Sequence, residues 1–339
     1  VSFRVAGSHF FGENGSEIGA FRGNLAVRSA GSGDDDLKSR MYTFDFGHGG
    51  HGFWLEGGGI SLEGNFAFGH RGAAFTVFSR PIEEAAGTPW FDARNLPPRF
   101  VDASDWEPRL SVDEVPFAAT GNIAAASESG FEVWYHKRVP QNTEHRVYSI
   151  VDDSVFWGMR KAPLAIAYAH YVEVRRVALF GGDAQDRRGI RTNFETTDVL
   201  FEDLEIRGFG VGILIPYFGN TEVTGGRFAN ERNFVIHTPI SWGRRVRITG
   251  AQRLEAEGPW RSSYHVALYR QKKQRPRNSR YLYDHNLFVA DEIELDGEQV
   301  YFFDQAPDAV PIPDSGPAAL IDLTSEQIRA RFGLTTGGA

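Results

Sequence analysis

Short alternations of apolar and polar residues, separated by Gly, Asn and Asp, follow one another along most of the chain. The segment 44–78 is typical, because its β-type runs are broken by Gly, His and Asn and none is long enough for a helix. Within it, the unit Gly-Asn-x-Ala at residues 64–67 also occurs at residues 23–26 and 121–124. A repeated strand-turn unit in a Gly-rich chain predicts a β-solenoid.

The second half of the chain repeats an apolar-x-apolar core at a more even spacing. Equivalent positions fall 27, 22 and 25 residues apart, which is near the length of one solenoid coil. Alternation of period two predicts that these four side chains point inward and stack on one another: Val174, Phe201, Val223 and Ile248. Glycines at 208, 210, 212, 225 and 226 argue against a helix, since each would cost about 1 kcal/mol in a helix interior.

The fold class that these patterns predict is all-β, a right-handed parallel β-helix with long inserted loops and about ten to twelve coils of about 25 residues. We expect the β-helix domain to span residues 1–305, with insertions at about 79–115 and 256–285. Residues 306–339 are predicted to form a Pro-rich linker and a short C-terminal helix at Thr324–Gly333. Asn24, Asn65 and Asn122 are interpreted as part of the fold, stacked as an amide ladder at coil corners.

Composition narrows the class of protein. No apolar run is long enough to span a membrane, and the net charge of −8 argues against general nucleic-acid binding, although a local basic site stays open. The absence of cysteine excludes disulfides and thiolate chemistry, and together with only two methionines it favours a bacterial protein that is secreted or displayed on the cell surface. The first and last residues read like cuts in a repeat, which predicts a longer multidomain parent chain.

Two groups of residues are candidates for catalysis. His48 and His51 precede Glu56, and a His and a Glu brought to one face by a turn can act as acid and base; a structural role in capping a turn is the alternative. Asp152 and Asp153 are further carboxylates for hydrolysis.

Other residues are candidates for binding. The adjacent carboxylates Asp34, Asp35 and Asp36 are hard oxygen ligands that suit Ca²⁺, with a solvated loop tip as the alternative. Six basic residues could hold an acidic polymer, with a solvated loop as an equal alternative: His136, Lys137, Arg138, Arg270, Lys272 and Lys273. Trp134 could stack on a sugar ring or simply pack in a loop.

The segment His51-Gly-Phe-Trp-Leu-Glu-Gly57, followed by the Gly-Asn-x-Ala unit at 64–67, resembles the β-helix domain of the cell-surface hyaluronidase and hyaluronan-binding cell-migration protein family and its bacterial relatives. A second match is the later Gly-Asn-x-Ala unit with its Gly-aromatic-x-x-Trp continuation at 121–134. One departure is Gly57, where the family has an acidic residue. The resemblance implies a hyaluronan-like substrate.

Two functions follow as hypotheses. The first is a polysaccharide hydrolase or lyase that degrades an acidic, uronate-containing polysaccharide by acid–base chemistry, with His51 and Glu56 as the reacting pair. The second is a non-catalytic polysaccharide-binding or adhesive module of a larger surface protein. Fold analogy alone cannot separate them, because β-helices carry out both kinds of function.

Overall fold

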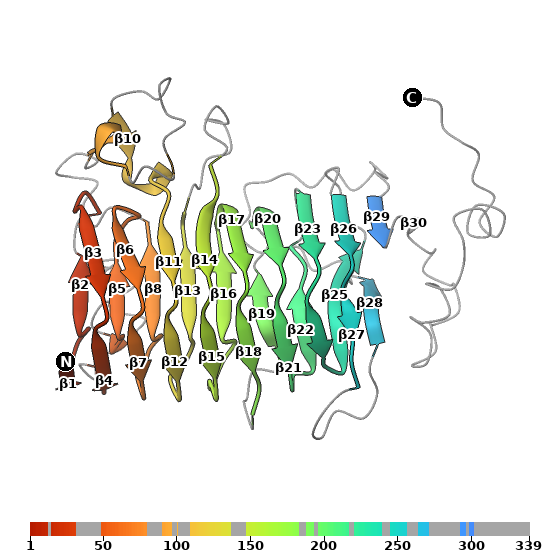
Figure 1. Ribbon diagram of the computed structural model, residues 1–339, viewed down its shortest axis with the longest axis horizontal. Coiled ribbons are helices and arrows are strands. Elements are labelled where there is room, and N and C mark those ends of the chain that lie inside the picture. The colour runs from red at the N-terminus through yellow and green to blue at the C-terminus, as the bar shows by residue number, and fades with distance from the viewer. Residues whose placement is uncertain are drawn as a thin grey trace.

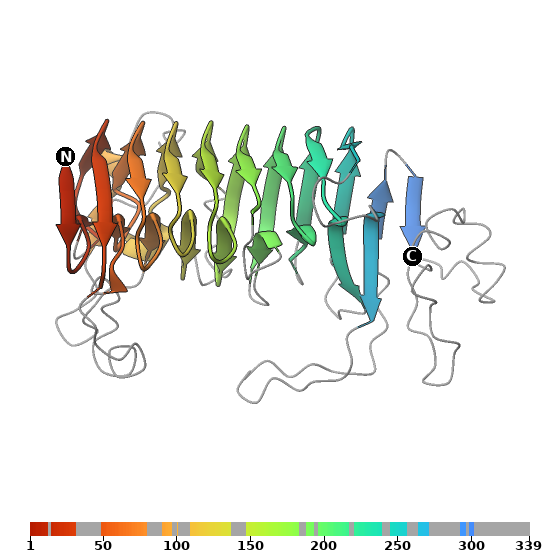
Figure 2. The same ribbon diagram turned by 90° about the horizontal axis from the view of Figure 1, so that it is seen from below.

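The described part of the chain forms parallel β-sheets whose strands are stacked along one long axis (Figures 1 and 2). The computed structural model describes residues 1–12, 15–31, 49–79, 90–96, 100, 109–136, 147–182, 188–192, 196–216, 220–238, 245–255, 264–270, 292–295 and 298–301. Within these ranges the regular structure is almost entirely strand, and successive strands of each sheet pair in parallel.

Three long sheets make up the described body. Sheet A contains β1 (Ser2–Val5), β4 (Leu25–Ser29), β7 (Phe66–Phe68), β12 (Ile123–Ala125), β15 (Val155–Trp157), β18 (Ala178–Phe180), β21 (Glu205–Arg207), β24 (Arg227–Ala229) and β27 (Gln252–Arg253). Sheet B contains β2 (Phe10–Gly12), β5 (Phe53–Leu55), β8 (Phe75–Phe78), β13 (Phe131–Trp134), β16 (Leu164–Ala167), β19 (Arg188–Thr192), β22 (Val211–Leu214), β25 (Arg232–Thr238) and β28 (Tyr264–Arg270). Sheet C contains β3 (Gly19–Arg22), β6 (Ile60–Glu63), β11 (Ala118–Thr120), β14 (Ser149–Asp152), β17 (His170–Arg175), β20 (Thr197–Glu202), β23 (Asn220–Thr224), β26 (Arg245–Thr249), β29 (Glu292–Leu295) and β30 (Glu298–Tyr301).

The chain visits the sheets in the fixed order A, B, C, and we call one such circuit a coil. Nine coils lie in the described part, numbered 1 to 9 from β1, and only β30 pairs antiparallel to its neighbour in these sheets. The predicted all-β fold of parallel sheets is therefore confirmed, and the described residues account for nine coils where ten to twelve are predicted for the whole chain. β28 lies inside the predicted insertion at 256–285 and belongs to sheet B.

The core is the space between the three sheets. The four side chains predicted to stack do so: Val174 pairs in register with Phe201, Phe201 with Val223, and Val223 with Ile248, and all four are buried. In the first coils the interior row of sheet B is a stack of phenylalanine rings. Phe10 lies 4.6 Å from Phe53, and Phe53 lies 5.0 Å from Phe75, measured between ring centroids.

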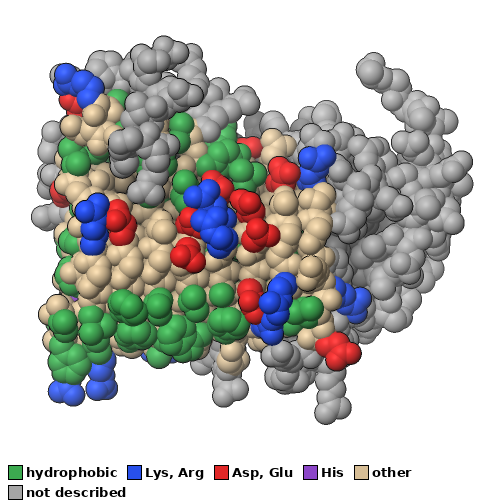
Figure 3. Space-filling view, in the orientation of Figure 1, with side chains coloured by type: hydrophobic (Ala, Val, Ile, Leu, Met, Phe, Trp, Pro, Cys, Tyr) green, Lys and Arg blue, Asp and Glu red, His purple; other side chains and the backbone are tan. Residues whose placement is uncertain are grey.

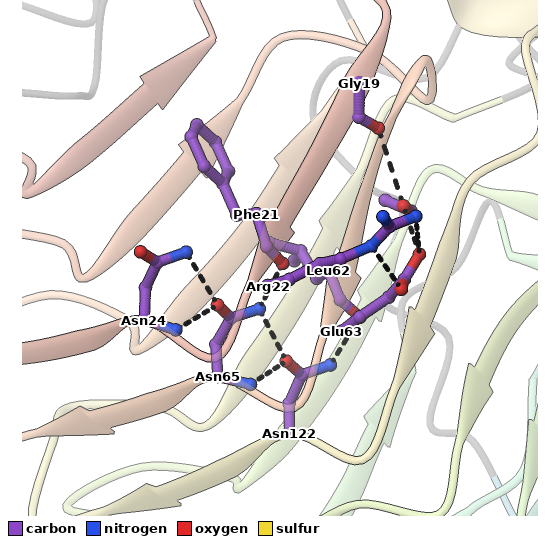
Figure 4. Close-up of polar contacts among 9 residues, drawn as sticks. Gly19, Phe21, Arg22, Asn24, Leu62, Glu63, Asn65 and Asn122 are labelled. Atoms are coloured by element: carbon purple, nitrogen blue, oxygen red, sulfur yellow. Dashed lines mark hydrogen bonds and ion pairs between the residues drawn. The ribbon is translucent and has the colours of Figure 1, made fainter.

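The repeated Asn residues form the predicted ladder at the corner between sheets C and A (Figure 4). Asn65 Nδ2 donates to Asn122 Oδ1 at 3.1 Å, and Asn24 Nδ2 donates to Asn65 Oδ1 at 3.2 Å. The residue before each Asn turns the corner with a positive φ, 61° at Gly64, a conformation that favours glycine. Ladder and glycine together explain why Gly-Asn recurs in the sequence.

The segment between β8 and β11, which contains the insertion predicted at about 79–115, leaves the three sheets, and its described residues pack around a core of their own. β9 (Trp90–Asp92) and β10 (Arg109–Ser111) pair antiparallel, and the short 3₁₀ helices η2 (Ala93–Asn95) and η4 (Val112–Glu114) follow them. The buried residues that hold this unit together are Phe91, Ala93, Leu96, Phe100, Leu110, Val115 and Ala118. The predicted linker and helix at 306–339 lie outside the described residues.

Candidate functional site

The outward side of sheet B in coils 2 to 4 carries aromatic and acidic side chains in place of the polar face expected of a solvated sheet. Phe53 and Leu55 of β5 point into the core, so Trp54 between them points outward. Trp54 stands opposite Thr76 of β8, and Thr76 opposite Glu132 of β13. We call this surface the sheet B face.

Trp54 joins the two residues that the sequence singles out. Its indole N–H donates a hydrogen bond to Glu56 Oε1, and its ring lies 4.7 Å from the His51 imidazole, between centroids. His51 precedes β5 and Glu56 follows it, so the strand holds them at its two ends. The structure therefore brings His51 and Glu56 to the same indole ring.

His51 is held in one orientation. Its Nδ1 accepts a hydrogen bond from the Ala73 backbone N–H at 3.0 Å, so the ring proton of a neutral His51 lies on Nε2. Glycines flank the ring on both sides: an added Cβ would lie 2.8 Å from the ring at Gly49 and 2.7 Å at Gly72. His51 is 8% exposed and Glu56 is fully buried.

Two coils further along, the same pairing recurs in the opposite order. Trp134 Nε1 donates to Glu132 Oε2 at 3.2 Å, and both side chains are partly exposed. Next to them the ring of Tyr135 stacks on Tyr168 of coil 5, with centroids 4.9 Å apart and ring planes inclined by 4°. These rings offer a flat, accessible aromatic surface beside a carboxylate.

The register sets the separation of the two glutamates. Glu56 and Glu132 lie two coils apart and are offset by two residues along the strands, so their backbones are about 12 Å apart. Glutamate side chains of that backbone separation can present carboxyl groups 6.5–9.5 Å apart, about the distance used by inverting glycosidases. Arg191 of β19 continues the outward row beyond Glu132 and Ala165.

Asp152 and Asp153 lie elsewhere, at the end of a strand of sheet C. Asp152 is 5% exposed, and its Oδ2 accepts a hydrogen bond from Arg176 Nη2 at 2.5 Å and forms an ion pair with Arg175, whose Nε lies 3.1 Å away. Asp153 turns the corner with φ 47°. The structure does not bring this pair together with His51 and Glu56, and an ion-paired carboxylate at a corner suits a role in the fold.

His136 is also placed away from solvent. It is fully buried, with Nε2 bonded to Ser149 Oγ at 2.5 Å and Nδ1 to Ser79 Oγ at 3.1 Å. This setting makes it part of the coil packing. Trp134, by contrast, does lie on the sheet B face.

The remaining candidates lie outside what the structure describes. These are His48, Asp34, Asp35, Asp36, Lys137, Arg138, Lys272 and Lys273, together with the side chain of Arg270, whose backbone ends β28. Among the described residues no group of three or more His, Cys, Asp or Glu side chains could hold a metal ion.

A second group of histidines lies at the corner between sheets A and B. His70 is fully buried; its Nδ1 is bonded to Ser29 Oγ at 3.1 Å, and its ring lies 5.2 Å from that of His9. Burial, followed by the nearby His9, lowers the pKa of His70 to about 3. His70 is therefore neutral near pH 7, and the Ser29–His70 pair is closed to substrate.

Close packing against the neighbouring coil explains why position 57 is a glycine. An added Cβ would lie 2.5 Å from the Gly15 carbonyl oxygen in the adjacent coil, and the same holds at Gly58, 2.2 Å from the Val115 oxygen. This fold therefore leaves no room for the acidic residue that follows the glutamate in the family of the resemblance.

No protein-family model, curated protein or solved structure matches the chain. Within the described residues there is also no helix of the length and apolar character that crossing a membrane requires.

Sequence reasoning missed Glu132, Tyr135 and Tyr168. The signal for Glu132 was present, since Glu-x-Trp at 132–134 has the same two-residue spacing as Trp-x-Glu at 54–56 and period two places both on one face.

Proposed function

We propose that the chain is a right-handed parallel β-helix that binds an acidic, uronate-containing polysaccharide on its sheet B face and degrades it by acid–base chemistry. The observation that carries the proposal is the two Trp–Glu pairs on adjacent parts of that face. Tyr135 and Tyr168 supply a flat stacking surface, which sugar rings use through their C–H faces. Arg191 supplies a guanidinium for a uronate carboxylate.

The proposed chemistry needs one group to take a proton and another to give one. Glu56 accepts an indole hydrogen bond that orients its carboxyl group, and we assign it the role of the base. Glu132 is the acid that protonates the departing glycosidic oxygen. In hydrolysis Glu56 removes a proton from water, whose oxygen bonds to the anomeric carbon as the glycosidic bond breaks.

Elimination would use the same two groups without water. The base would take the proton α to the uronate carboxyl group, a double bond would form in the sugar ring, and the leaving oxygen would accept the proton from the acid. His51, packed on Trp54, keeps the Trp54–Glu56 pair in place in either reaction.

A second candidate function is a binding or adhesive module. It is favoured by the burial of Glu56 and His51, because the accessible residues Trp134, Tyr135 and Tyr168 can hold a sugar chain without either of them. Both functions place the protein outside a bacterial cell, as part of a longer multidomain chain, with Asp34–Asp36 as the proposed Ca²⁺ ligands.

The test is a chain-length assay on hyaluronan, chondroitin sulfate, pectate and alginate, with Ca²⁺ or with chelator. Shortening with new ultraviolet absorbance indicates elimination, and shortening without it indicates hydrolysis. We expect Glu56→Gln and Glu132→Gln each to lower the rate at least 100-fold while binding is kept. Binding without shortening of any substrate would support the second candidate, and neither binding nor shortening would refute both.

A further inference from the structure

The outward side of sheet A is apolar over six consecutive coils. Alternation along each strand sends one residue inward and its two neighbours outward, and here the outward residues are apolar as well. They form two rows along the long axis. The first row is Leu25, Phe66, Ile123, Val155 and Ala178, and the second row is Phe3, Val27, Phe68, Ala125, Trp157 and Phe180.

These eleven residues, which we call the sheet A face, appear as a continuous hydrophobic band in the lower part of Figure 3. Phe3 is 56% exposed, Phe66 39% and Trp157 40%, three of the most exposed large apolar side chains in the described residues. Trp157 reaches across Ala125 to Phe68, with centroids 6.2 Å apart, and so fills the gap left by the small residue.

The sheet A face has about the size of the largest apolar patch on a typical monomer, and such a patch is often functional. Six coils at about 4.8 Å each give a length of about 29 Å, and two rows that are each about 7 Å wide give a width of about 14 Å, so the patch covers about 400 Å². Monomeric proteins rarely expose more than a few hundred Å² of contiguous apolar surface without using it.

The band ends at a charged coil. Glu205 stands in the first row and Arg207 in the second, in register with Ala178 and Phe180 of the preceding coil. The two side chains are themselves ion-paired at 2.7 Å and are partly exposed. An occupant that covers the band therefore meets one acidic and one basic side chain at its end.

We propose that the sheet A face binds the same face of a second copy of this chain, with the two long axes parallel. A twofold axis along the coil stack places each coil opposite the same coil of the partner, with the first row against the second. Small residues then meet large ones, Ala178 against Phe180 and Ala125 against Ile123. The same operation places Glu205 against the partner's Arg207 and the reverse, which completes a four-charge network.

An antiparallel pair covers the same apolar rows but carries the charged coil beyond the partner's first coil, so this complementarity selects the parallel arrangement.

The buried area predicts a weak association. Two faces of about 400 Å² bury about 800 Å² in total, below the roughly 1,200 Å² of a stable interface, so the dissociation constant should be micromolar or weaker.

The experiment is sedimentation velocity on the full chain from low micromolar to several hundred micromolar. We expect reversible dimers, and at least a tenfold higher dissociation constant for Phe66→Asp. The matched control is Ile18→Asp, an exposed apolar residue outside sheet A that is 57% exposed, which should leave the constant unchanged.

Charge exchange tests the orientation. Glu205→Arg and Arg207→Glu should each weaken self-association, whereas an equal mixture of the two variants should form heterodimers, because every facing pair is then opposite in charge. A chain that stays monomeric at the highest concentration overturns the proposal, as does a mixture that associates no better than its components. Binding of the monomer to vesicles of phosphatidylcholine and phosphatidylglycerol, lost in Phe66→Asp, would assign the face to lipid and would also overturn it.

Discussion

Replacing Asn65 by alanine should destabilise the stack far more than replacing Asn24, although both belong to the same ladder. Asn65 is fully buried and its side chain makes four hydrogen bonds (Figure 4). Its Oδ1 accepts from the Asn24 backbone N–H at 3.0 Å and from Asn24 Nδ2 at 3.2 Å, and its Nδ2 donates to the Phe21 carbonyl at 2.8 Å and to Asn122 Oδ1 at 3.1 Å.

The expected loss of unfolding free energy follows from the number of hydrogen bonds. Each bond contributes about 1 kcal/mol, and buried groups left without a partner add to the loss, so Asn65→Ala should cost about 3–5 kcal/mol. Asn24 stands at the open end of the ladder and its side chain donates one bond, so Asn24→Ala should cost about 1 kcal/mol. Asn65→Asp keeps the acceptor but sets an oxygen against the Phe21 carbonyl, and should recover part of its loss when acid protonates it.

The assay is urea unfolding followed by circular dichroism, with hydrogen exchange of the amides in β3 and β6 as a local readout. Exchange in these strands should accelerate in Asn65→Ala and stay near wild type in Asn24→Ala. Equal unfolding free energies for the two alanine variants would refute the reasoning, because the ladder would then carry no more energy in its buried middle than at its end.

Three further predictions concern stability. The pKa of His70 is about 3 in the folded state and about 6.5 in the unfolded state, so between these pH values the unfolded state binds more protons. The free energy of unfolding should therefore fall by up to about 1.4 kcal/mol per pH unit as the pH drops from 6.5 towards 3. Urea midpoints at pH 7 and pH 5 should show a smaller fall in His70→Gln than in the wild type. Gly57→Asp should lower the melting temperature by several degrees, since its Cβ meets the neighbouring coil, whereas Gly182→Ala, with open space around it, should change little. Asp152→Asn should lower the free energy of unfolding by about 1–3 kcal/mol, because it removes the nearly buried negative charge that pairs with two arginines, and it should leave polysaccharide turnover unchanged. A loss of turnover with normal stability would show that Asp152 is a catalytic group.

The core positions could be predicted from the sequence because the repeat constrains which residues point inward. Inward residues of successive coils, such as Phe201 and Val223, must stack on each other, so apolar residues recur at these positions. A corner that joins the asparagine ladder needs Gly followed by Asn in each coil that takes part. The length of chain in each coil was less predictable, since inserted residues such as those of β9 and β10 lengthen one coil without changing the stack.

The outer faces were less predictable for a physical reason. The alternation of side chains along a strand shows which residues share a side, but it does not show whether that side is exposed to solvent. Large apolar residues such as Phe66 and Trp157 could therefore be core residues by sequence, and in the structure they lie on the surface. Likewise His136 and Lys137 are neighbours in a basic tripeptide, and only packing shows that His136 is enclosed by Ser79 and Ser149.

The measurement that tests the proposed function most directly is affinity electrophoresis in gels containing hyaluronan, pectate or alginate, comparing Trp134→Ala with Trp157→Ala. Both remove a partly exposed tryptophan from an outer sheet surface, the first from the sheet B face and the second from the sheet A face. The proposed function predicts retardation of the wild-type chain by at least one acidic polysaccharide, its loss in Trp134→Ala by an affinity drop of at least tenfold, and wild-type retardation in Trp157→Ala. Retardation that survives Trp134→Ala, or that is lost in Trp157→Ala alone, would contradict it.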